Sequence, residues 1–410
     1  MRFLTRSPLA ARFQYADVLD RQRARSAPGS LGNENLGARR VSDASRRLMS
    51  NLYDTIVIGA GQAGLASAYY LQRAGSQFLV LEGGGQIGES WLRRWDSLRL
   101  FTPVRYNSLP GLPFPGEPYA LPAKDDVARY LEAYVAHFAL PVRLKTRVVS
   151  LARDAHRFVV TTDGETFTAR SVIVATGAYH RAYIPAFAGA LSPSLIQIHS
   201  SEYRNPDALP PGSVLVVGAG NSGAQIALEL AESGRCTWLS GRDTGSIPRR
   251  MLGRDVYDWL WWTVMRPSIE SWVGRRLMGN GLFTGDPLVG FSRRALMIPM
   301  LTTVGRTVGV SNGHPRLDDE RVLDDVRTVV WCTGFRPDFR WIQLPVFGPE
   351  GYPEHRRGIV AAAPGLGFVG LRYQYRIGSS LLGGVHEDAE YVVRRLDAHA
   401  DRASAAHIST

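Results

Sequence analysis

Asp54-Thr-Ile-Val-Ile-Gly59-Ala-Gly61-Gln-Ala-Gly64 is the stretch that decides the fold. Its short β-branched run, residues 56–58, predicts a buried parallel strand, and helical periodicity begins directly after the glycines. In the turn between them, Gly59 permits a tight bend and Gly61 lets the backbone approach a pyrophosphate. Gly64 lets the helix pack closely on the strand, with the helix N-terminus facing the phosphates. The stretch therefore predicts a dinucleotide-binding unit.

An acidic residue makes this prediction specific. The next predicted strand, residues 78–81, is followed by Glu82. A carboxylate about 20 residues beyond the glycines accepts hydrogen bonds from ribose hydroxyls. A lone glycine pattern could be a turn without a ligand, but strand, turn, helix and acid occur here together. We predict an FAD site that includes Gly59, Gly61, Gly64 and Glu82.

The same pattern occurs a second time, at Val214-Leu-Val-Val-Gly218-Ala-Gly220-Asn-Ser-Gly223. The strand that follows ends in Ser240 and Arg242, where the first copy has a carboxylate. An acid would repel a 2′-phosphate, whereas arginine pairs with it through charge-assisted hydrogen bonds. We predict an NADPH site here, and Asp243 beside Arg242 leaves NADH open. The predicted binding residues are Gly218, Gly220, Asn221, Ser222, Gly223, Ser240 and Arg242.

Composition excludes several other classes. The chain has 410 residues and a net charge of +11, but residues 1–48 hold ten arginines against four acidic residues. The remainder has no basic run interleaved with aromatics, which disfavours nucleic-acid binding. The sequence has no apolar run of about 18 residues, so we predict no transmembrane segment. We also predict no metal site.

The two cysteines bear on the reaction class. Cys236 and Cys332 lie far apart, without a C-x-x-C pair, which disfavours a dithiol reductase. Each falls in a predicted strand, so we expect both to be buried small hydrophobes. This usage fits a reducing compartment, and we predict a cytoplasmic protein.

The chain divides into an N-terminal extension and two nucleotide units. Residues 1–50 are rich in Arg, Ser, Gly and Asn and lack periodicity, so we expect a disordered or mis-assigned extension, with Met49 as an alternative start. Two strands end in Thr-Gly turns that let the backbone approach a cofactor: Thr176-Gly177 and Thr333-Gly334. The chain should cross between the units there. We therefore predict an α/β fold with two Rossmann-like domains, the NADP domain (184–324) being inserted in the FAD domain (51–183 and 325–402).

An irregular segment, residues 83–103, follows Glu82 directly. Its aromatic and arginine content suggests that it wraps a ligand; the alternative is a surface loop with Trp91 and Trp95 tucked inward. We select Trp91 as a cofactor-binding residue, and Thr102 as a catalytic candidate that lines the flavin. Asp96 is a catalytic candidate, with an ion pair to Arg93 as the other interpretation. A helix capped by Asp125 or Asp126 and a meander of strands at 142–149, 158–162 and 166–169 should follow.

Two further segments complete the predicted site. The tryptophan- and arginine-rich stretch at about 250–300 predicts one or two amphipathic helices that cover a substrate cavity or a domain interface, while contact with a membrane surface stays open. Near the C-terminus, residues 370–382 form a Ser/Gly turn ahead of a final helix at 387–400. Its N–H groups and positive helix end suit negative charge on a reduced flavin, so we select Gly370, Ser380 and Leu381.

These landmarks together resemble the class B flavin-dependent monooxygenases, and most closely the bacterial flavin-containing-monooxygenase-like flavoproteins associated with cation efflux. The resemblance covers residues 52–400 and is carried by both glycine clusters, Glu82, and residues 91–103, 175–177 and 332–338. The family fingerprint F-x-G-x-x-x-H-x-x-x-(Y/F/W) corresponds to Phe187, Gly189, His199 and Tyr203. It departs from the pattern because nine residues, and not three, separate Gly189 from His199.

The resemblance implies that His199 organises the turn between the domains; a satisfied core histidine is the alternative. It also implies an NADPH- and FAD-dependent monooxygenase in which a flavin C4a-peroxide transfers one oxygen atom from O2 to a small organic substrate. Homodimers are allowed. The Asn-centred loop of the amine- and sulfide-oxidising members is not found, so their substrate range is not carried over. A flavin reductase or oxidase passing electrons to oxygen or a protein partner would share every nucleotide motif.

Overall fold

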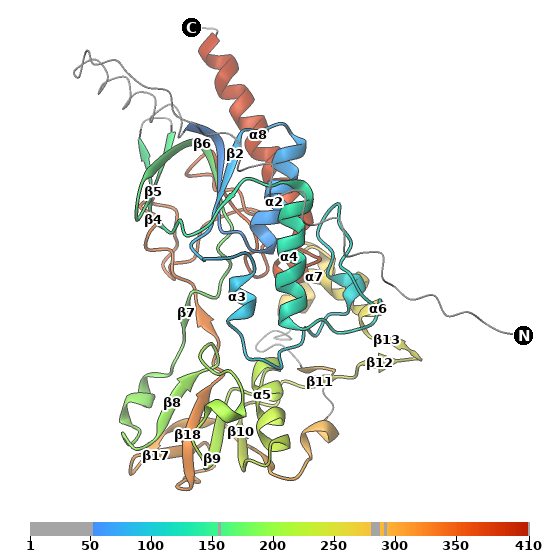
Figure 1. Ribbon diagram of the computed structural model, residues 1–410, viewed down its shortest axis with the longest axis vertical. Helices are drawn as coiled ribbons and strands as arrows, with labels where there is room; N and C mark the ends of the chain where they lie inside the picture. The colour runs from blue at the N-terminus through green and yellow to red at the C-terminus, as the bar shows by residue number, and fades with distance from the viewer. Residues whose placement is uncertain (1–51, 155–156, 280–287, 291–292, 409–410) are drawn as a thin grey trace, which may run out of the picture. The chain divides into compact units, whose positions relative to one another are not determined.

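The computed structural model describes residues 52–154, 157–279, 288–290 and 293–408 (Figure 1). The predicted N-terminal extension, residues 1–50, lies outside this part of the chain. The described residues form two large sheets and four two-stranded ones. The first large sheet is mixed, with an antiparallel meander beside its parallel strands, and the second is parallel. In each large sheet one strand is followed directly by a glycine turn and a helix. This arrangement has the α/β character and the duplicated unit that the two glycine clusters predict.

The first sheet has the strand order β3-β2-β1-β6-β5-β4, with β20 also paired to β6. Strand β1 lies between β2 and β6 and is parallel to both, so its carboxyl end opens the first glycine turn in the middle of the sheet. The strands are β1 (Leu52–Ile58), β2 (Phe78–Leu81), β3 (Val142–Arg143), β4 (Val148–Asp154), β5 (Arg157–Thr162), β6 (Thr166–Val174) and β20 (Leu366–Phe368).

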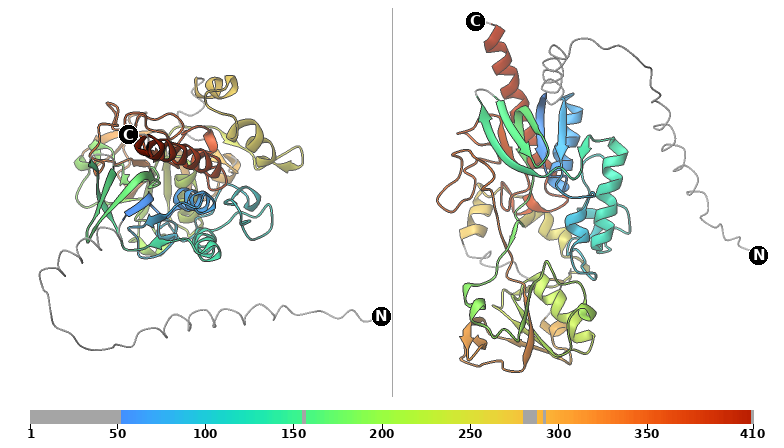
Figure 2. Two further views of the ribbon diagram at one scale, coloured as in Figure 1. Left: turned by 90° about the horizontal axis from the view of Figure 1, so that it is seen from above. Right: turned by 60° about the vertical axis from the view of Figure 1, so that its left-hand side comes forward.

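Alternate side chains of β1 serve two apolar clusters. Val57 packs with the helices on one face, whereas Ile56 and Ile58 pack with the meander strands β4 and β5 on the other. Helix α2 packs on both α4 and α8, and the views in Figure 2 show the three helices relative to the sheet. The helical segments of this unit are α2 (Gln62–Arg73), α3 (Glu89–Leu92), η2 (Val104–Tyr106), α4 (Lys124–Phe138), η7 (Ile377–Ser380) and α8 (His386–Ile408).

The second sheet is parallel throughout, with the order β15-β10-β9-β18-β8. Strand β9 leads into the second glycine turn and helix α5, as β1 leads into α2. The elements are η3 (Ala186–Ala190), β8 (Ile196–His199), η4 (Pro206–Ala208), β9 (Ser213–Val217), α5 (Asn221–Glu232), β10 (Thr237–Ser240), β15 (Leu301–Val304), β16 (Thr307–Ser311), β17 (His314–Leu317) and β18 (Val326–Trp331).

The chain leaves the first unit and returns to it through a two-stranded antiparallel ribbon. Strand β7 (Arg181–Ala182) runs towards the second sheet and pairs with β19 (Phe335–Arg336), which runs back. The second unit is therefore an insertion in the first, as predicted. The domain boundaries at 183/184 and 324/325 stay predictions.

The segment predicted as a helical insertion contains short elements. A single turn of α6 (Tyr257–Leu260) continues as the π-helix η5 (Trp261–Met265), and α7 (Trp272–Gly279) follows. The remaining elements are β11 (Ser246–Ile247), β12 (Arg250–Met251), β13 (Arg254–Asp255), β14 (Leu288–Val289) and η6 (Arg293–Leu296). No helix in the described part of the chain combines the length and apolarity needed to cross a membrane.

Three local predictions need correction. Residues 142–143 do not belong to the meander, because β3 pairs in parallel with β2. Residues 166–169 and 171–174 form one continuous strand, β6. Cys236 is exposed and not buried, because it stands one residue before β10 at the end of the preceding turn. Asp126 does satisfy the start of α4, accepting a 2.8 Å hydrogen bond from the N–H of Ala123.

Candidate functional site

The first glycine turn contains two structural glycines and one that faces open space. A Cβ on Gly64 would lie 1.8 Å from the carbonyl oxygen of Gly59. Gly59, with φ of +103°, in turn lies against Ala175, whose carbonyl oxygen would be 2.8 Å from a Cβ. Around Gly61, a Cβ would meet no atom within 4 Å. Gly61 is also the N-cap of α2 and provides no side-chain cap, so the first N–H groups of the helix can bind a ligand.

The second glycine turn repeats this geometry. A Cβ on Gly223 would lie 1.8 Å from the carbonyl oxygen of Gly218, which packs against Cys332 at the end of β18. Gly220 has no atom within 4 Å of a built Cβ and is the uncapped N-terminus of α5. Both turns therefore fit a dinucleotide pyrophosphate, which requires close backbone approach and free N–H groups at a helix start.

The residues next to the second turn have different surroundings. The side-chain oxygen of Asn221 accepts a 3.1 Å hydrogen bond from the N–H of Val289, so it ties α5 to the insertion. Ser222 is exposed at the start of the helix. Of this predicted pair, Ser222 is the residue that presents its side chain to solvent at the turn.

Glu82 supports the first turn and keeps acceptor capacity. One carboxylate oxygen accepts from the N–H of Ala60 and the other from the N–H of Gly84, each at 2.7 Å. The residue is half-buried at the end of β2. A carboxylate has about four lone-pair sites, so two remain for ribose hydroxyls. This arrangement fits the predicted contact with FAD.

Ser240 does not fit its predicted role. Its side chain is fully buried, and its hydroxyl lies 2.8 Å from the carbonyl oxygen of Gly305 and 2.8 Å from the N–H of Thr307. A hydroxyl used in this way cannot also reach a phosphate in solvent. Ser240 instead fixes the turn that follows β15, and the prediction that it binds the 2′-phosphate is wrong.

Two arginines occupy the edge where the 2′-phosphate was expected. β10 and β15 are parallel neighbours in which Ser240 pairs with Val304. Arg242 and Arg306 each lie two residues beyond this pair, and both are exposed. Sequence reasoning missed Arg306, although the repeated Gly-Arg dipeptide at the two strand ends was a readable signal.

The segment at 83–103 is partly tucked inward. Trp91, in α3, packs on the main apolar cluster, and Trp95 is 4% exposed. The indole N–H of Trp95 is buried without a hydrogen-bond partner among the described residues, which leaves a donor for a ligand. The expected Asp96–Arg93 ion pair is wrong: Arg93 pairs with Glu89.

Asp96 is exposed and connects the two units. Its carboxylate accepts a 2.7 Å hydrogen bond from the side-chain amide of Asn205, and its N–H donates to the carbonyl oxygen of Arg204 at 2.8 Å. The carboxylate and the N–H of Asp96 thus both have hydrogen-bond partners between β8 and β9 of the second unit. They favour a role in holding the units together over a role in proton transfer.

Thr102 forms a buried pair with a residue that the sequence analysis did not select. Its hydroxyl donates to the side-chain oxygen of Asn107 at 2.7 Å, and the Asn107 amide donates to the carbonyl oxygens of Thr102 and Pro103 at 3.0 Å each. Asn107 is 1% exposed. The pair closes the loop around η2, against which the insertion packs through Asp258 and the hydroxyl of Tyr106, 2.6 Å apart.

Replacing Asn107 with alanine should lower the free energy of unfolding by about 3 kcal/mol, because it leaves two buried carbonyl oxygens and the Thr102 hydroxyl without partners. Urea unfolding of the purified protein measures this change. Thr102→Val removes a single bond and should cost less. Equal, small effects of both substitutions would show that the loop does not depend on this pair.

Two histidines hold the crossing between the units. His199 is 1% exposed, and its Nε2 lies 3.0 Å from the carbonyl oxygen of Gly334, which also accepts from the N–H of Tyr183 at 2.9 Å. His180 accepts at Nδ1 from the N–H of Asp338 at 2.7 Å, and its Nε2 lies 3.2 Å from the carbonyl oxygen of Thr176. His199 therefore organises the turn between the domains, and His180 acts beside it.

The partners of the two rings determine their protonation. A carbonyl oxygen only accepts, so Nε2 carries the proton in both rings, while Nδ1 accepts from the N–H of Ser201 in one and of Asp338 in the other. Both rings are therefore neutral. Burial lowers the pKa of His199 and of His180 below the ordinary value of 6.5.

The crossing should therefore weaken in mild acid. Well above pH 6.5 both rings are neutral in the folded and in the unfolded chain, so the free energy of unfolding does not depend on pH through them. Below pH 6.5 the rings of the unfolded chain take up protons, while those of the folded chain stay neutral until the pH reaches their lower pKa. The free energy of unfolding therefore falls as the pH is lowered through this range. Burial also lowers the pKa of His355 and His386. Because these other histidines contribute to the pH dependence in both proteins, the test compares the variant with the wild type. The urea concentration at the midpoint of unfolding should fall less between pH 7.5 and 5.5 in His199→Gln than in the wild type. Parallel falls would contradict the assignment.

The crossing glycines also face open space. Gly177 and Gly334 have φ of +73° and +83°, and a Cβ on either would meet no atom within 4 Å. The Thr333 hydroxyl donates to the carbonyl oxygen of Tyr183, so it braces the ribbon. Backbone of Thr176 lies beside the first glycine turn, and backbone of Cys332, which precedes Thr333, lies beside the second. The cofactor contacts of these Thr-Gly turns stay predictions.

The C-terminal segment meets the start of α2. Gly370, with φ of +88°, would place a Cβ 2.7 Å from that of Ala63, and the side-chain amide of Gln62 lies 3.4 Å from the carbonyl oxygen of Ser380. Ser379, and not Ser380, closes the turn, because its hydroxyl accepts from the N–H of Arg376 at 2.9 Å. Ser380 and Leu381 are half-buried beside this contact.

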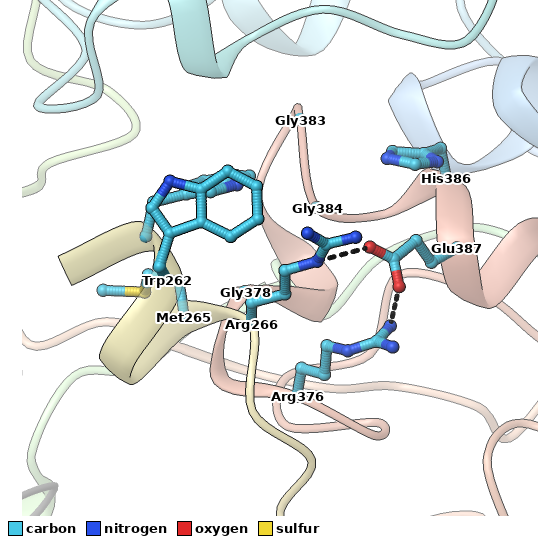
Figure 3. Close-up of a pocket in the computed structure, with 10 residues that line it drawn as sticks. Trp262, Met265, Arg266, Arg376, Gly378, Gly383, Gly384, His386 and Glu387 are labelled. Carbon is cyan, nitrogen blue, oxygen red and sulfur yellow. Dashed lines mark ion pairs between the residues drawn. The ribbon is translucent and has the colours of Figure 1, made fainter. Parts of the chain in front are cut away.

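A cavity of about 220 Å³ lies on the same C-terminal loop. Figure 3 shows its lining: side chains of the π-helix η5 on one side, and Arg376 and Glu387 with backbone of the loop on the other. The lining residues are Trp261, Trp262, Met265, Arg266, Arg376, Gly378, Gly383, Gly384, His386 and Glu387.

Comparison with known proteins assigns the family. The chain is 40% identical over 357 residues to the uncharacterized oxidoreductase CzcO-like of Geobacillus kaustophilus, covering 86% of this chain and 100% of that protein. The chain belongs to the CzcO-like oxidoreductases. Residues 56–251 of this CzcO-like protein also match the family described as pyridine nucleotide-disulphide oxidoreductase.

More distant relatives give the CzcO-like chain its wider context. Rice indole-3-pyruvate monooxygenase YUCCA1 is 36% identical over 239 residues, 57% of each chain. The flavin-containing monooxygenase from Stenotrophomonas maltophilia has a TM-score of 0.69 and 28% identity, covering 85% of this chain and 99% of that one. The CzcO-like protein is a class B flavin monooxygenase-like protein and an FAD-dependent oxidoreductase.

These comparisons confirm the predicted family, the two-unit α/β fold, and FAD and NADPH as the cofactors of such proteins. The residues that hold each cofactor in this CzcO-like chain are proposals. A homodimer and a cytoplasmic location stay predictions.

Proposed function

We propose that this CzcO-like protein is an NADPH- and FAD-dependent monooxygenase that transfers one oxygen atom from O2 to a small organic substrate. One observation supports the two cofactors: two uncapped helix starts, each with a glycine facing open space, are followed by a carboxylate in one unit and by an exposed arginine in the other. Oxygen transfer, which separates this proposal from a flavin reductase with the same nucleotide sites, is supported by the similarity to flavin monooxygenases. Such a pair suits FAD at Gly61 and NADPH at Gly220.

The chain's own groups bind and orient. The N–H groups at the starts of α2 and α5 hold the two pyrophosphates, Glu82 accepts from the FAD ribose, and Arg242 with Arg306 pairs with the 2′-phosphate. Residues 378–384 and the buried loop around Thr102 exclude water from the reacting region. When bound, FAD supplies the redox chemistry, taking two electrons from NADPH and reacting with O2.

The overall reaction balances without a further reductant. Substrate, O2, NADPH and one proton give oxygenated substrate, NADP⁺ and water. One oxygen atom enters the substrate and the other leaves as water, with the two electrons supplied by NADPH.

The test measures where the oxygen goes. Holoenzyme is mixed with NADPH and 18O2 in the presence of sulfides, amines, ketones or small organic acids, and NADPH use, hydrogen peroxide and labelled product are quantified. We expect a substrate that gives one labelled oxygen per NADPH and suppresses peroxide release. If, with every compound, one mole of hydrogen peroxide is released per mole of NADPH consumed and no labelled product forms, the protein is a flavin oxidase or reductase instead.

A further inference from the structure

The cavity at the start of α8 has an aromatic wall. Trp261, Trp262 and Met265 line it from η5, and Trp262 is 59% exposed. These residues belong to a π-helix, an arrangement that occurs as short segments and frequently at functional sites. One side of the cavity therefore suits an apolar or aromatic body.

The opposite side carries excess positive charge. The Glu387 carboxylate is shared by two guanidinium groups: Arg376 Nη1 at 2.6 Å and Arg266 Nε at 3.3 Å. Arg266 also lies over the Trp262 ring, 4.7 Å from its centroid. Burial lowers the pKa of His386, so this neighbour adds no charge at neutral pH. Among the residues that line the cavity, two cations face one anion, which leaves one positive charge. The buried Asp388 also interacts with Arg376, but its own ion pair is with Arg357, which offsets its charge. The N-terminus of α8 adds to the positive charge.

The cavity's size and position restrict what it can hold. At about 220 Å³ it is smaller than the pockets of about 300–1,000 Å³ that take drug-sized ligands. Its wall includes Gly378, Gly383 and Gly384, and Ser380 and Leu381 of the same loop are the residues assigned to the flavin. A compound bound here lies next to the proposed reaction centre.

We propose that this cavity takes the substrate, and that the substrate is a small organic acid with an apolar or aromatic body. The carboxylate pairs with Arg266 and Arg376, and the body lies against Trp261 and Trp262. That the bound acid is the substrate rests on the proposed function. That the cavity binds organic acids rests only on the residues that line it.

The test is calorimetric titration of oxidised, full-length holoenzyme without NADPH. The probes are 3-phenylpropanoate and hexanoate, each compared with its neutral amide. The acids should bind about tenfold or more tightly than the amides, because a charge-assisted hydrogen bond contributes about 1.5–3 kcal/mol. Arg266→Gln should reduce this preference to less than about twofold. Arg266 is half-exposed, so the variant should fold.

Arg250→Gln is the matched control, because it removes the same charge from an exposed position of the insertion that does not line the cavity. It should keep the acid preference. The inference is overturned by equal binding of acids and amides, by loss of preference in both variants, or by no saturable binding of either acid up to about 10 mM. Binding is read without turnover, so a failed oxygenation assay leaves this result interpretable, and the reverse also holds.

Discussion

Replacing Gly64 with alanine should lower the free energy of unfolding by about 4 kcal/mol or more, because the new methyl group would lie 1.8 Å from the carbonyl oxygen of Gly59. That oxygen belongs to backbone, which cannot move aside as a flexible side chain can. To relieve the overlap, α2 must move away from β1, and the apolar cluster under Val57 opens with it. Urea unfolding of the apoprotein measures the loss without a contribution from bound flavin.

Gly61→Ala is the matched control for this substitution. The same methyl group at Gly61 meets no atom within 4 Å, and its φ of −78° suits alanine. Stability of the apoprotein should therefore stay within about 0.5 kcal/mol of wild type, while FAD affinity falls because the methyl group occupies the space assigned to the pyrophosphate. If both variants lose stability and flavin alike, the division into a packing glycine and a ligand-facing glycine is wrong.

The second large effect concerns the choice of nicotinamide cofactor. Arg242→Gln and Arg306→Gln should each weaken NADPH binding by about 10- to 100-fold, since each removes a charge-assisted contact to the 2′-phosphate. NADH has no such phosphate and should lose little. Flavin reduction rates measured over a range of NADPH and NADH concentrations separate the two cofactors.

Arg327→Gln is the control for general charge loss. Arg327 is exposed at the opposite, N-terminal edge of the same sheet, in β18. The Arg327→Gln substitution should leave the preference for NADPH over NADH unchanged. Equal losses for NADPH and NADH in Arg242→Gln would contradict the assignment of the 2′-phosphate, and an unaffected Arg306→Gln would restrict it to Arg242 alone.

The features that could be predicted from the sequence are those that depend on residues close together in the chain. Each glycine turn needs a residue without Cβ at fixed spacing between a strand and a helix, so both turns and the insertion topology were readable. The Thr-Gly strand ends beside Gly59 and Gly218 follow from the same requirement for close backbone approach.

The errors have a common physical origin in contacts between distant segments. Ser240 has the sequence position of a ligand contact, but its hydroxyl donates to the carbonyl oxygen of Gly305, which lies 65 residues later, directly after β15. Arg306 reaches the same edge only because β15 pairs with β10. His180 binds Asp338, 158 residues away, and Asp96 binds Asn205, 109 residues away. Asn107 is a different case, because its partners Thr102 and Pro103 are close in sequence but lie in a loop that has no periodicity to read.

The ribbon of β7 and β19 has a consequence for how such chains diversify. Because its two strands are antiparallel neighbours, the ends of the intervening segment lie side by side, and a segment of this kind can be exchanged without opening the sheet that receives it. The exchangeable segment carries Arg242, Arg306 and the tryptophan-rich wall of the cavity together. On the assignments proposed above, an exchange of this segment would change the cofactor preference and one side of the substrate cavity together, while the sheet that receives it stays in place.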